Sequence, residues 1–210
     1  GGAVHRAVVN IGGIANVTDL PPGGTVRGFD TGPGNVLLDL WHERHRGGAF
    51  DADGAWAASG RVDAGLLAVL LAEPFLALAP PKSTGRDLFN AGWLDARLAG
   101  GRTAAVDVQA TLLEFTGQSI AQAIGVHCAG ATDVLVCGGG ARNAALVARL
   151  SARLAPRTVR TTDTAGVPSG QVEALAFAWL ARETLAGRPG NLPAVTGAAG
   201  PRVLGAVYPA

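Results

Sequence analysis

One aspartate in a glycine-rich segment is the residue of this sequence best placed to do chemistry. Asp30 lies in Gly28-Phe29-Asp30-Thr31-Gly32-Pro33-Gly34-Asn35, at the end of a stretch that is typical of a strand. Glycines and a proline fix the backbone there, which predicts close approach of the main chain to a ligand. A carboxylate at the C-terminal end of a strand can act as a general base or hold a metal ion through water. The alternative is a side chain that caps the turn.

Two glycine turns have the composition of phosphate-binding segments. Gly12 and Gly13 follow an apolar strand pattern and would present consecutive backbone amides, although a plain hairpin turn has the same composition. The run 138–140 lies between an apolar strand and a helix that begins near Asn143, so a flat ring or a phosphate could lie directly on its backbone. Neither turn has the GxGxxG pattern, so a nicotinamide cofactor is not supported.

Two further polar features are ambiguous from spacing alone. The segment 82–86 carries two cations and two hydroxyl groups, which predicts contact with an anion or a sugar, or an exposed loop that caps the next helix. It lacks the glycines that precede the lysine in a Walker-type phosphate loop. Glu173 begins a helix, where it interacts favourably with the helix N-terminus or accepts hydrogen bonds from a polyhydroxylated ligand. Spacing favours the first reading of Glu173.

Histidine and cysteine do not form a metal-binding pattern. The four histidines share no ligand spacing, and His42 and His45 fall on a helix face with charged, solvated surroundings. Cys128 and Cys137 also lack metal-ligand spacing, and Cys137 is expected to be a buried free thiol in a strand. We assign no metal ligand from the sequence.

Composition limits the class of protein. The 210 residues are 48% hydrophobic and 16% charged, which excludes disorder and predicts a compact fold. A net charge of +1 does not favour nucleic acid or an anionic membrane as a partner, and no apolar run is long enough for a membrane span. The cysteine usage favours a cytoplasmic setting. Because methionine is absent and a strand pattern begins almost at once, we expect an N-terminal portion to be missing.

The hydrophobic periodicity predicts an α/β fold with a mixed sheet flanked by helices. The expected strands are 7–13, 14–18, 25–29, 134–137, 158–162 and 203–208, and the expected helices are 35–45, 51–58, 62–71, 87–98, 103–129, 143–154 and 173–185. The apolar positions of the last helix are Leu175, Phe177, Trp179 and Leu180. This divides the chain into a strand meander at about 7–30, a helical region at 35–129 and strand–helix units at 134–210.

Seven segments occur in an order that is more specific than any one of them. They are 10–16, 28–35, 81–86 with Phe89-Asn90, 107–112, 136–140 with Asn143, 173–181, and 190–193 with 195–198. In this order they resemble the anhydro-N-acetylmuramic acid kinase family, from about Val8 to Pro209. The resemblance implies the actin/hexokinase/Hsp70-like (ribonuclease H-like) fold. It also implies that residues 1–210 are a single C-terminal lobe of a two-lobe kinase, without the N-terminal lobe and its Gly-Thr-Ser phosphate turn.

The resemblance also implies a reaction and its ligands. Water opens the ring of 1,6-anhydro-N-acetylmuramic acid, and the freed O6 receives the γ-phosphoryl group of ATP, with Mg²⁺ as the companion ion. The product is N-acetylmuramic acid 6-phosphate, and the role is recycling of peptidoglycan. The expected partners are this anhydro amino sugar and ATP, with neither nucleic acid nor membrane, and a homodimer is one arrangement that we consider.

The same resemblance assigns roles to individual residues. It gives Asp30 the role of catalytic base. For ATP binding it implies Gly12 and Gly13 as a phosphate turn, with Gly138, Gly139, Gly140 and Asn143 against the nucleotide. For the sugar it implies Glu173, Asn10 and Thr31. Because the N-terminal phosphate turn is absent, we expect the 210 residues alone to be inactive. The alternatives are a non-catalytic remnant that binds sugar or nucleotide weakly, and another sugar kinase of the same fold.

Overall fold

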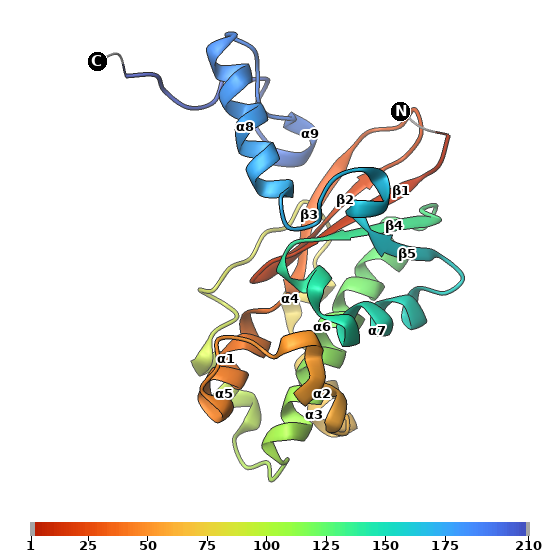
Figure 1. Cartoon of the computed structure of the whole chain (residues 1–210), viewed down its shortest axis with the longest axis vertical. Helices are drawn as coiled ribbons and strands as arrows, with labels where there is room; N and C mark the ends of the chain where they lie inside the picture. Colours follow the sequence, from red (N-terminus) through yellow and green to blue (C-terminus); the bar gives the residue numbers. More distant parts are fainter. Residues whose placement is uncertain (1–2, 209–210) are drawn as a thin grey trace.

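A computed structural model describes residues 3–208 and shows a five-stranded mixed sheet flanked by helices (Figure 1). Strands β1 (Arg6–Ile11), β2 (Ile14–Leu20) and β3 (Arg27–Pro33) form an antiparallel meander. Strands β4 (Asp133–Cys137) and β5 (Thr158–Thr161) extend the sheet in parallel beside β1, in the order β3-β2-β1-β4-β5. The predicted α/β class with a mixed sheet is confirmed, and this order is the one expected of a ribonuclease H-like lobe.

Most of the helical residues lie between the meander and β4. The helices are α1 (Val36–Arg46), α2 (Ala55–Ser59), α3 (Ala64–Leu71), α4 (Pro74–Ala77), α5 (Ala91–Leu98), α6 (Ala105–His127), α7 (Ala144–Leu154), α8 (Val172–Leu185) and α9 (Pro193–Thr196), with short 3-10 turns η1 (Ala52–Gly54), η2 (Gly139–Arg142) and η3 (Thr162–Ala165). None of these helices is both long and apolar enough to cross a membrane.

The core lies between one face of the sheet and the long helix α6 (Figure 1). Alternate residues of β1, such as Val9 and Ile11, are buried on this face, whereas β4 is buried along its whole length. On the opposite face, Asn10 and Asn16 are only half-buried. Polar side chains of β1 and β2 are therefore available to a ligand on that side.

The third strand is longer than predicted, and this changes the place of the key aspartate. β3 continues to Pro33, so Asp30 lies inside the strand and not at its end. Asn16 pairs with Asp30 and Ala15 pairs with Gly32, which leaves Thr31 as the extra residue of a β-bulge. Proline is tolerated at the end of β3 because β3 is an edge strand. Bulges of this kind re-aim side chains and occur often beside active sites.

Two helix predictions were wrong in their boundaries for local reasons. The helix expected at 87–98 begins at Ala91, because the Asn90 side chain accepts a hydrogen bond from the Trp93 amide at 3.0 Å and caps it there. The helix expected at 51–58 is divided into η1 and α2. Asp53 adopts a positive φ of 55°, which interrupts the helix.

The end of the chain differs most from prediction. Residues 203–208 form no strand and are exposed. Helix α8 forms as predicted, but Phe177 is 70% exposed, and Leu175 and Trp179 are also exposed. Figure 1 shows α8 and α9 at the end of the molecule opposite α1 and α5. The helix predicted from the apolar pattern of α8 is therefore confirmed. Its apolar side chains are not buried by other described residues, although such a pattern predicts that they would be.

Candidate active site

Hydrogen bonds from residues 34–36, which follow β3, hold the hairpin at Gly12 and Gly13 in place. The Gly12 carbonyl accepts from the Asn35 amide at 2.8 Å, and the Gly13 carbonyl accepts from the amides of Gly34 and Val36 at 2.9 and 3.1 Å. The carbonyls of both glycines thus accept hydrogen bonds from within the protein. Their N–H groups have no backbone acceptor among residues 3–208. Such free consecutive amides are the groups that bind phosphate oxygens.

The three consecutive glycines after β4 are not equivalent. A Cβ on Gly138 would lie 2.4 Å from Oδ1 of Asn10, and a Cβ on Gly140 would lie 2.3 Å from Cγ2 of Ile11. Gly138 also has a φ of +81°, which favours glycine, and its amide donates to the Ser169 carbonyl at 3.0 Å. Gly138 and Gly140 therefore allow η2 to pack on the end of β1. Gly139 is the glycine of this run that borders both cavities described next.

The first cavity brings together most of the predicted site residues. It has a volume of about 430 Å³ and lies where β1 and β4 end. Its lining residues are Asn10, Gly12, Gly13, Gly138, Gly139, Arg142, Ser169, Gly170, Val172 and Glu173. Glu173 enters from the first turn of α8, so residues that are 163 positions apart in the chain (10 and 173) share one cleft. Gly140 is buried and does not line this cavity.

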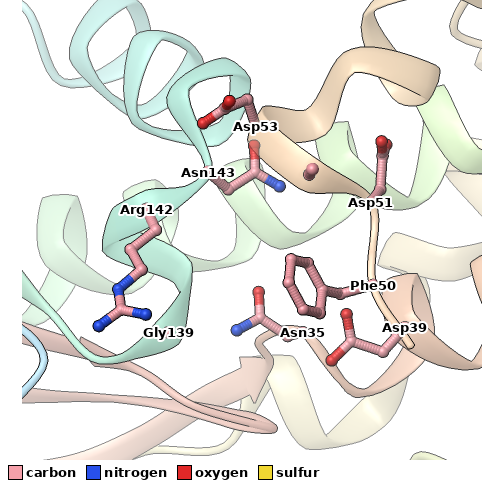
Figure 2. A pocket seen from close by; sticks show the side chains of 9 residues that line it. Asn35, Asp39, Phe50, Asp51, Asp53, Gly139, Arg142 and Asn143 are labelled. Carbon is pink, nitrogen blue, oxygen red and sulfur yellow. The ribbon is translucent and has the colours of Figure 1, made fainter. Parts of the chain in front are cut away.

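The second cavity, of about 290 Å³, is drawn in Figure 2. It shares Gly139 and Arg142 with the first cavity. Its lining residues are Asn35, Asp39, Phe50, Asp51, Ala52, Asp53, Gly139, Arg142 and Asn143. Asn143 begins α7 and its Oδ1 accepts from the Leu146 amide at 3.0 Å, which leaves its side-chain amide toward the cavity (Figure 2). Phe50 presents an aromatic ring that is 65% exposed. Phe50 was not predicted as a site residue, because no local pattern distinguishes it from other loop residues.

Two acidic residues of the second cavity, Asp51 and Asp39, have different surroundings. Asp51 accepts from the amides of Trp56 and Ala57, both at 2.9 Å, so it caps α2. For Asp39, burial raises the pKa to about 6, and the positive charges of His42 and Arg86 oppose this shift. Burial therefore disfavours the charged form of the Asp39 carboxyl group.

Asp30 lies in a third, smaller hollow of about 240 Å³, beside β2 and the edge strand β3. Pairing across the strands places Asn10 opposite Asn16 and Asn16 opposite Asp30, so the three side chains form a row on one face of the sheet. All three are half-buried. This row connects the glycine-lined cleft to Asp30 over two strand spacings, about 10 Å. Asn16 was not predicted as a site residue, although strand alternation from Asn10 through the hairpin could have found it.

The structure gives Thr31 a place in the sheet and not in a cavity. Thr31 is 1% exposed, and its hydroxyl donates to the Ala15 carbonyl at 3.1 Å. As the extra residue of the bulge, it points to the core face while Asp30 points to the opposite one. This placement does not support the predicted contact of Thr31 with the sugar.

The segment 82–86 has three separate roles in the structure. The Lys82 ammonium turns inward and donates to the carbonyls of Phe75 and Leu76 at 3.2 and 3.0 Å, and burial lowers the pKa of Lys82. Ser83 and Thr84 contact Asp30, as described below. Arg86 is exposed, and a Cβ on Gly13 would lie 3.7 Å from its Nη2. Of the two cations, Arg86 is thus the one beside the candidate phosphate turn.

The histidines and cysteines take part in packing and in local polar contacts, such as that of His5 Nε2 with Oδ1 of Asp19 at 2.6 Å. His45 lies against Trp41, with ring centroids 4.0 Å apart, and His42 donates from Nδ1 to the Gly48 carbonyl at 2.9 Å. Cys137 is a buried free thiol, as predicted, and burial raises its pKa to about 11. No group of three or more metal-ligating side chains occurs within residues 3–208.

A family model described as anhydro-N-acetylmuramic acid kinase matches residues 2–210. The chain belongs to this family. The kinases of this name include a relative from Thiobacillus denitrificans that is 56% identical over 99% of this chain, and one from Bordetella petrii that is 59% identical over 98% of it. The chain spans about half the length of these curated relatives, 56% and 55% respectively. The resemblance inferred from the ordered motifs is confirmed.

Solved structures add a weaker similarity. The activator of the 2-hydroxyisocaproyl-CoA dehydratase from Clostridium difficile, with bound ADPNP, has a TM-score of 0.48 and 15% sequence identity to this member of the kinase family. The similarity covers 85% of this chain and 62% of that chain.

Proposed function

We propose that this protein acts in an ATP-dependent kinase that converts 1,6-anhydro-N-acetylmuramic acid and water to N-acetylmuramic acid 6-phosphate. The observation that carries the proposal is the polar row of Asn10, Asn16 and Asp30, which runs from the glycine-lined cleft to a half-buried carboxylate. Kinase family membership supports ATP and a sugar as the two substrates. The role in peptidoglycan recycling and the cytoplasmic setting belong to this proposal.

The two adjoining cavities suggest where ATP would bind. We place the adenosine in the 290 Å³ cavity, where the exposed Phe50 ring can stack on the base and the Asn143 amide can donate to it. The phosphates would then pass Gly139 and Arg142 into the 430 Å³ cleft. There the free amides of Gly12 and Gly13 would bind phosphate oxygens. In this proposal Glu173 and Asn10 contact the sugar hydroxyl groups from the same cleft.

Asp30 would start the reaction as a general base. Its carboxylate takes a proton from water as the water oxygen attacks the anomeric carbon, and the bond from that carbon to O6 breaks. The freed O6 attacks the γ-phosphorus of ATP, the bond from that phosphorus to the bridging oxygen breaks, and ADP leaves. Asp30 then releases its proton to solvent. In these two steps the same oxygen, O6, is first the leaving group and then the nucleophile.

Mg²⁺ enters this proposal as the companion of ATP. In kinases the ion is held mainly by phosphate oxygens and water, with one or two carboxylates, and not by an all-protein cage. The described residues form no cluster of three ligating side chains. We therefore assign no residue of the chain to Mg²⁺ and derive no step from it.

Isotope labelling tests the order of bonds. The full-length protein is incubated with ATP, Mg²⁺ and the anhydrosugar in H₂¹⁸O, and the product is quenched within minutes and analysed by mass spectrometry. We expect one ¹⁸O at the anomeric hydroxyl group and none in the phosphate. Label in free phosphate with no sugar phosphate would indicate an ATPase and contradict the proposal. Product incubated in H₂¹⁸O without protein corrects for slow exchange at the anomeric carbon.

Replacement of the base tests the role of Asp30. Asp30→Asn should lower kcat about 10³-fold, because general base catalysis contributes on the order of 10² to 10⁴ in rate. Affinity for ATP should not change. Asp87→Asn, at an exposed carboxylate that directly follows the segment 82–86, is the matched control. Turnover by Asp30→Asn at the wild-type rate would remove Asp30 from this role, and binding of both ligands without turnover by the wild type would favour the non-catalytic alternative.

A further inference from the structure

The loop at 82–84 is attached to β3 through a single residue, Asp30. The Asp30 amide donates to the Lys82 carbonyl at 3.1 Å. In return, Oδ2 of Asp30 accepts from the Ser83 hydroxyl and from the Thr84 amide, both at 2.9 Å. Main chain and side chain of Asp30 are thus both held by three consecutive residues that lie more than fifty positions away in the sequence.

We propose that Ser83 and Thr84 are positioning residues for the Asp30 carboxylate. Both donors bind Oδ2, and within the described part of the chain Oδ1 accepts no hydrogen bond. A carboxylate with one oxygen held by two donors has a fixed orientation, so the other oxygen points in a defined direction. A general base needs this, because proton transfer requires a short and aligned contact with the attacking water. The inference rests on the proposed function, since it concerns the same base.

Ser83 and Thr84 together form a clamp on the Asp30 carboxylate, and Lys82 holds this clamp in place. The Lys82 ammonium donates to two carbonyls of α4, those of Phe75 and Leu76, and lies 4.7 Å from the centre of the Phe75 ring. Phe75 is buried in the core. The loop is therefore ordered through α4, and Ser83 and Thr84 do not have to be ordered when the substrate binds. Catalytic side chains held by such a supporting layer keep their geometry within the tolerance that catalysis needs.

The exposure of Ser83 argues for a purpose beyond packing. Ser83 is exposed, so water could satisfy its hydroxyl without any contact with Asp30. Removal of this hydroxyl therefore leaves no buried polar group unpaired and should not affect folding. The competing explanation is a local turn motif that merely closes the loop, and this explanation predicts no effect on the reaction.

Kinetics of conservative variants separate these explanations. Ser83→Ala should lower kcat about tenfold and leave the KM values for ATP and the sugar and the melting temperature unchanged. Ser83→Thr keeps the hydroxyl group and should retain most of the activity. Ser59→Ala is the matched control, because Ser59 is also exposed and its hydroxyl bonds only to the Trp56 carbonyl. Equal kcat for Ser83→Ala and wild type would overturn the positioning role.

Hydrogen exchange tests the clamp without any turnover. In the ¹⁵N-labelled protein the Thr84 amide should be protected, and Asp30→Ala should make it exchange at least about tenfold faster, because its acceptor is lost. Asp87→Ala should leave the Thr84 amide protected. Exchange at an unchanged rate in Asp30→Ala would overturn the clamp even if the protein is an active kinase. A protected Thr84 amide in a full-length protein that makes no sugar phosphate would instead contradict the proposed function and leave the clamp in place.

Discussion

Gly34 lies so close to Gly12 that a Cβ on residue 34 would be 2.3 Å from the Gly12 carbonyl oxygen. The adjacent Asn35 amide donates to that same oxygen at 2.8 Å. The sequence had suggested that the glycines around Pro33 bring backbone close to a ligand. In the structure, Gly34 instead brings backbone close to the other glycine turn, so that one glycine segment holds the shape of the other.

Replacement of Gly34 by alanine should therefore disturb a site that residue 34 does not line. The added methyl group meets backbone that cannot move aside, so Gly34→Ala should lower the free energy of unfolding by about 3 kcal/mol. It should also weaken ATP binding, since the Gly12-Gly13 amides shift. Urea unfolding and calorimetric titration measure both. Gly125→Ala is the control: that exposed helical glycine has open space around it, and alanine there should stabilise by about 0.5 to 1 kcal/mol.

Asn16 stands between Asn10 and Asp30 in the polar row, so its removal should affect the sugar and not the nucleotide. Asn16→Ala should raise the KM for the anhydrosugar about tenfold, as expected for loss of one or two hydrogen bonds, with the affinity for ATP unchanged. Steady-state kinetics with each substrate varied in turn measure this. Thr158→Ala, at an exposed position of β5, is the control. An equal rise in the two KM values would contradict the assignment of the row to the sugar.

Arg142 borders both cavities and forms no ion pair among the described carboxylates. If the nucleotide passes between the cavities, this cation lies beside its phosphates. Arg142→Gln should weaken ATP binding about tenfold or more and should change adenosine binding little, because adenosine carries no phosphate. Isothermal titration with both ligands distinguishes them. Arg102→Gln, at an exposed loop position, should have no effect on either.

The raised pKa of Asp39 predicts a pH-dependent cost in stability. Its folded-state pKa is about 6, above the ordinary value of 3.8, because burial disfavours the charged form. The cost is therefore absent below about pH 4, grows as the pH rises through 6, and is fully present above that. Asp39→Asn should leave the melting temperature unchanged at pH 4 and raise it by about 2 °C at pH 7.5, a small gain because the side chain is only half-buried.

A matched substitution on the same helix checks this explanation. Glu43 is exposed on α1, and Glu43→Gln should change the melting temperature little at either pH. Thermal unfolding of both variants at several pH values gives the comparison. A stabilisation by Asp39→Asn that is equal at pH 4 and pH 7.5 would show that packing, and not charge burial, is the cause.

The sequence predicted the features that depend on local pattern. Short strand patterns joined by tight turns predicted the meander, a continuous apolar run predicted β4, and the order of motifs indicated the family. The position of Asp30 within β3 could not be predicted, because it depends on the bulge at Thr31, and a bulge is set by pairing with β2. A strand that continues through glycine and proline contradicts propensity, and only its edge position in the sheet allows it.

The structure brings several of the predicted site residues together, and their roles stay predictions. Asn10, Gly12, Gly13, Gly138, Gly139 and Glu173 line one cleft. Gly138 and Gly140 allow close packing on β1, which the sequence cannot distinguish from ligand contact because both need the absence of a side chain. The direction of Lys82 was also beyond prediction, because its partners are backbone carbonyls of a helix whose position depends on tertiary packing.

The exposed apolar face of α8 should affect the solubility of the polypeptide. Phe177 and Leu185 are 70% and 76% exposed, and the adjoining segment adds Val207 and Tyr208. Salts such as sulfate strengthen the association of apolar surfaces, because they are excluded from them. Ammonium sulfate should therefore increase light scattering and the fluorescence of a hydrophobic dye at concentrations that leave most proteins of this size in solution. Low ionic strength is the condition in which this polypeptide should be purified and stored.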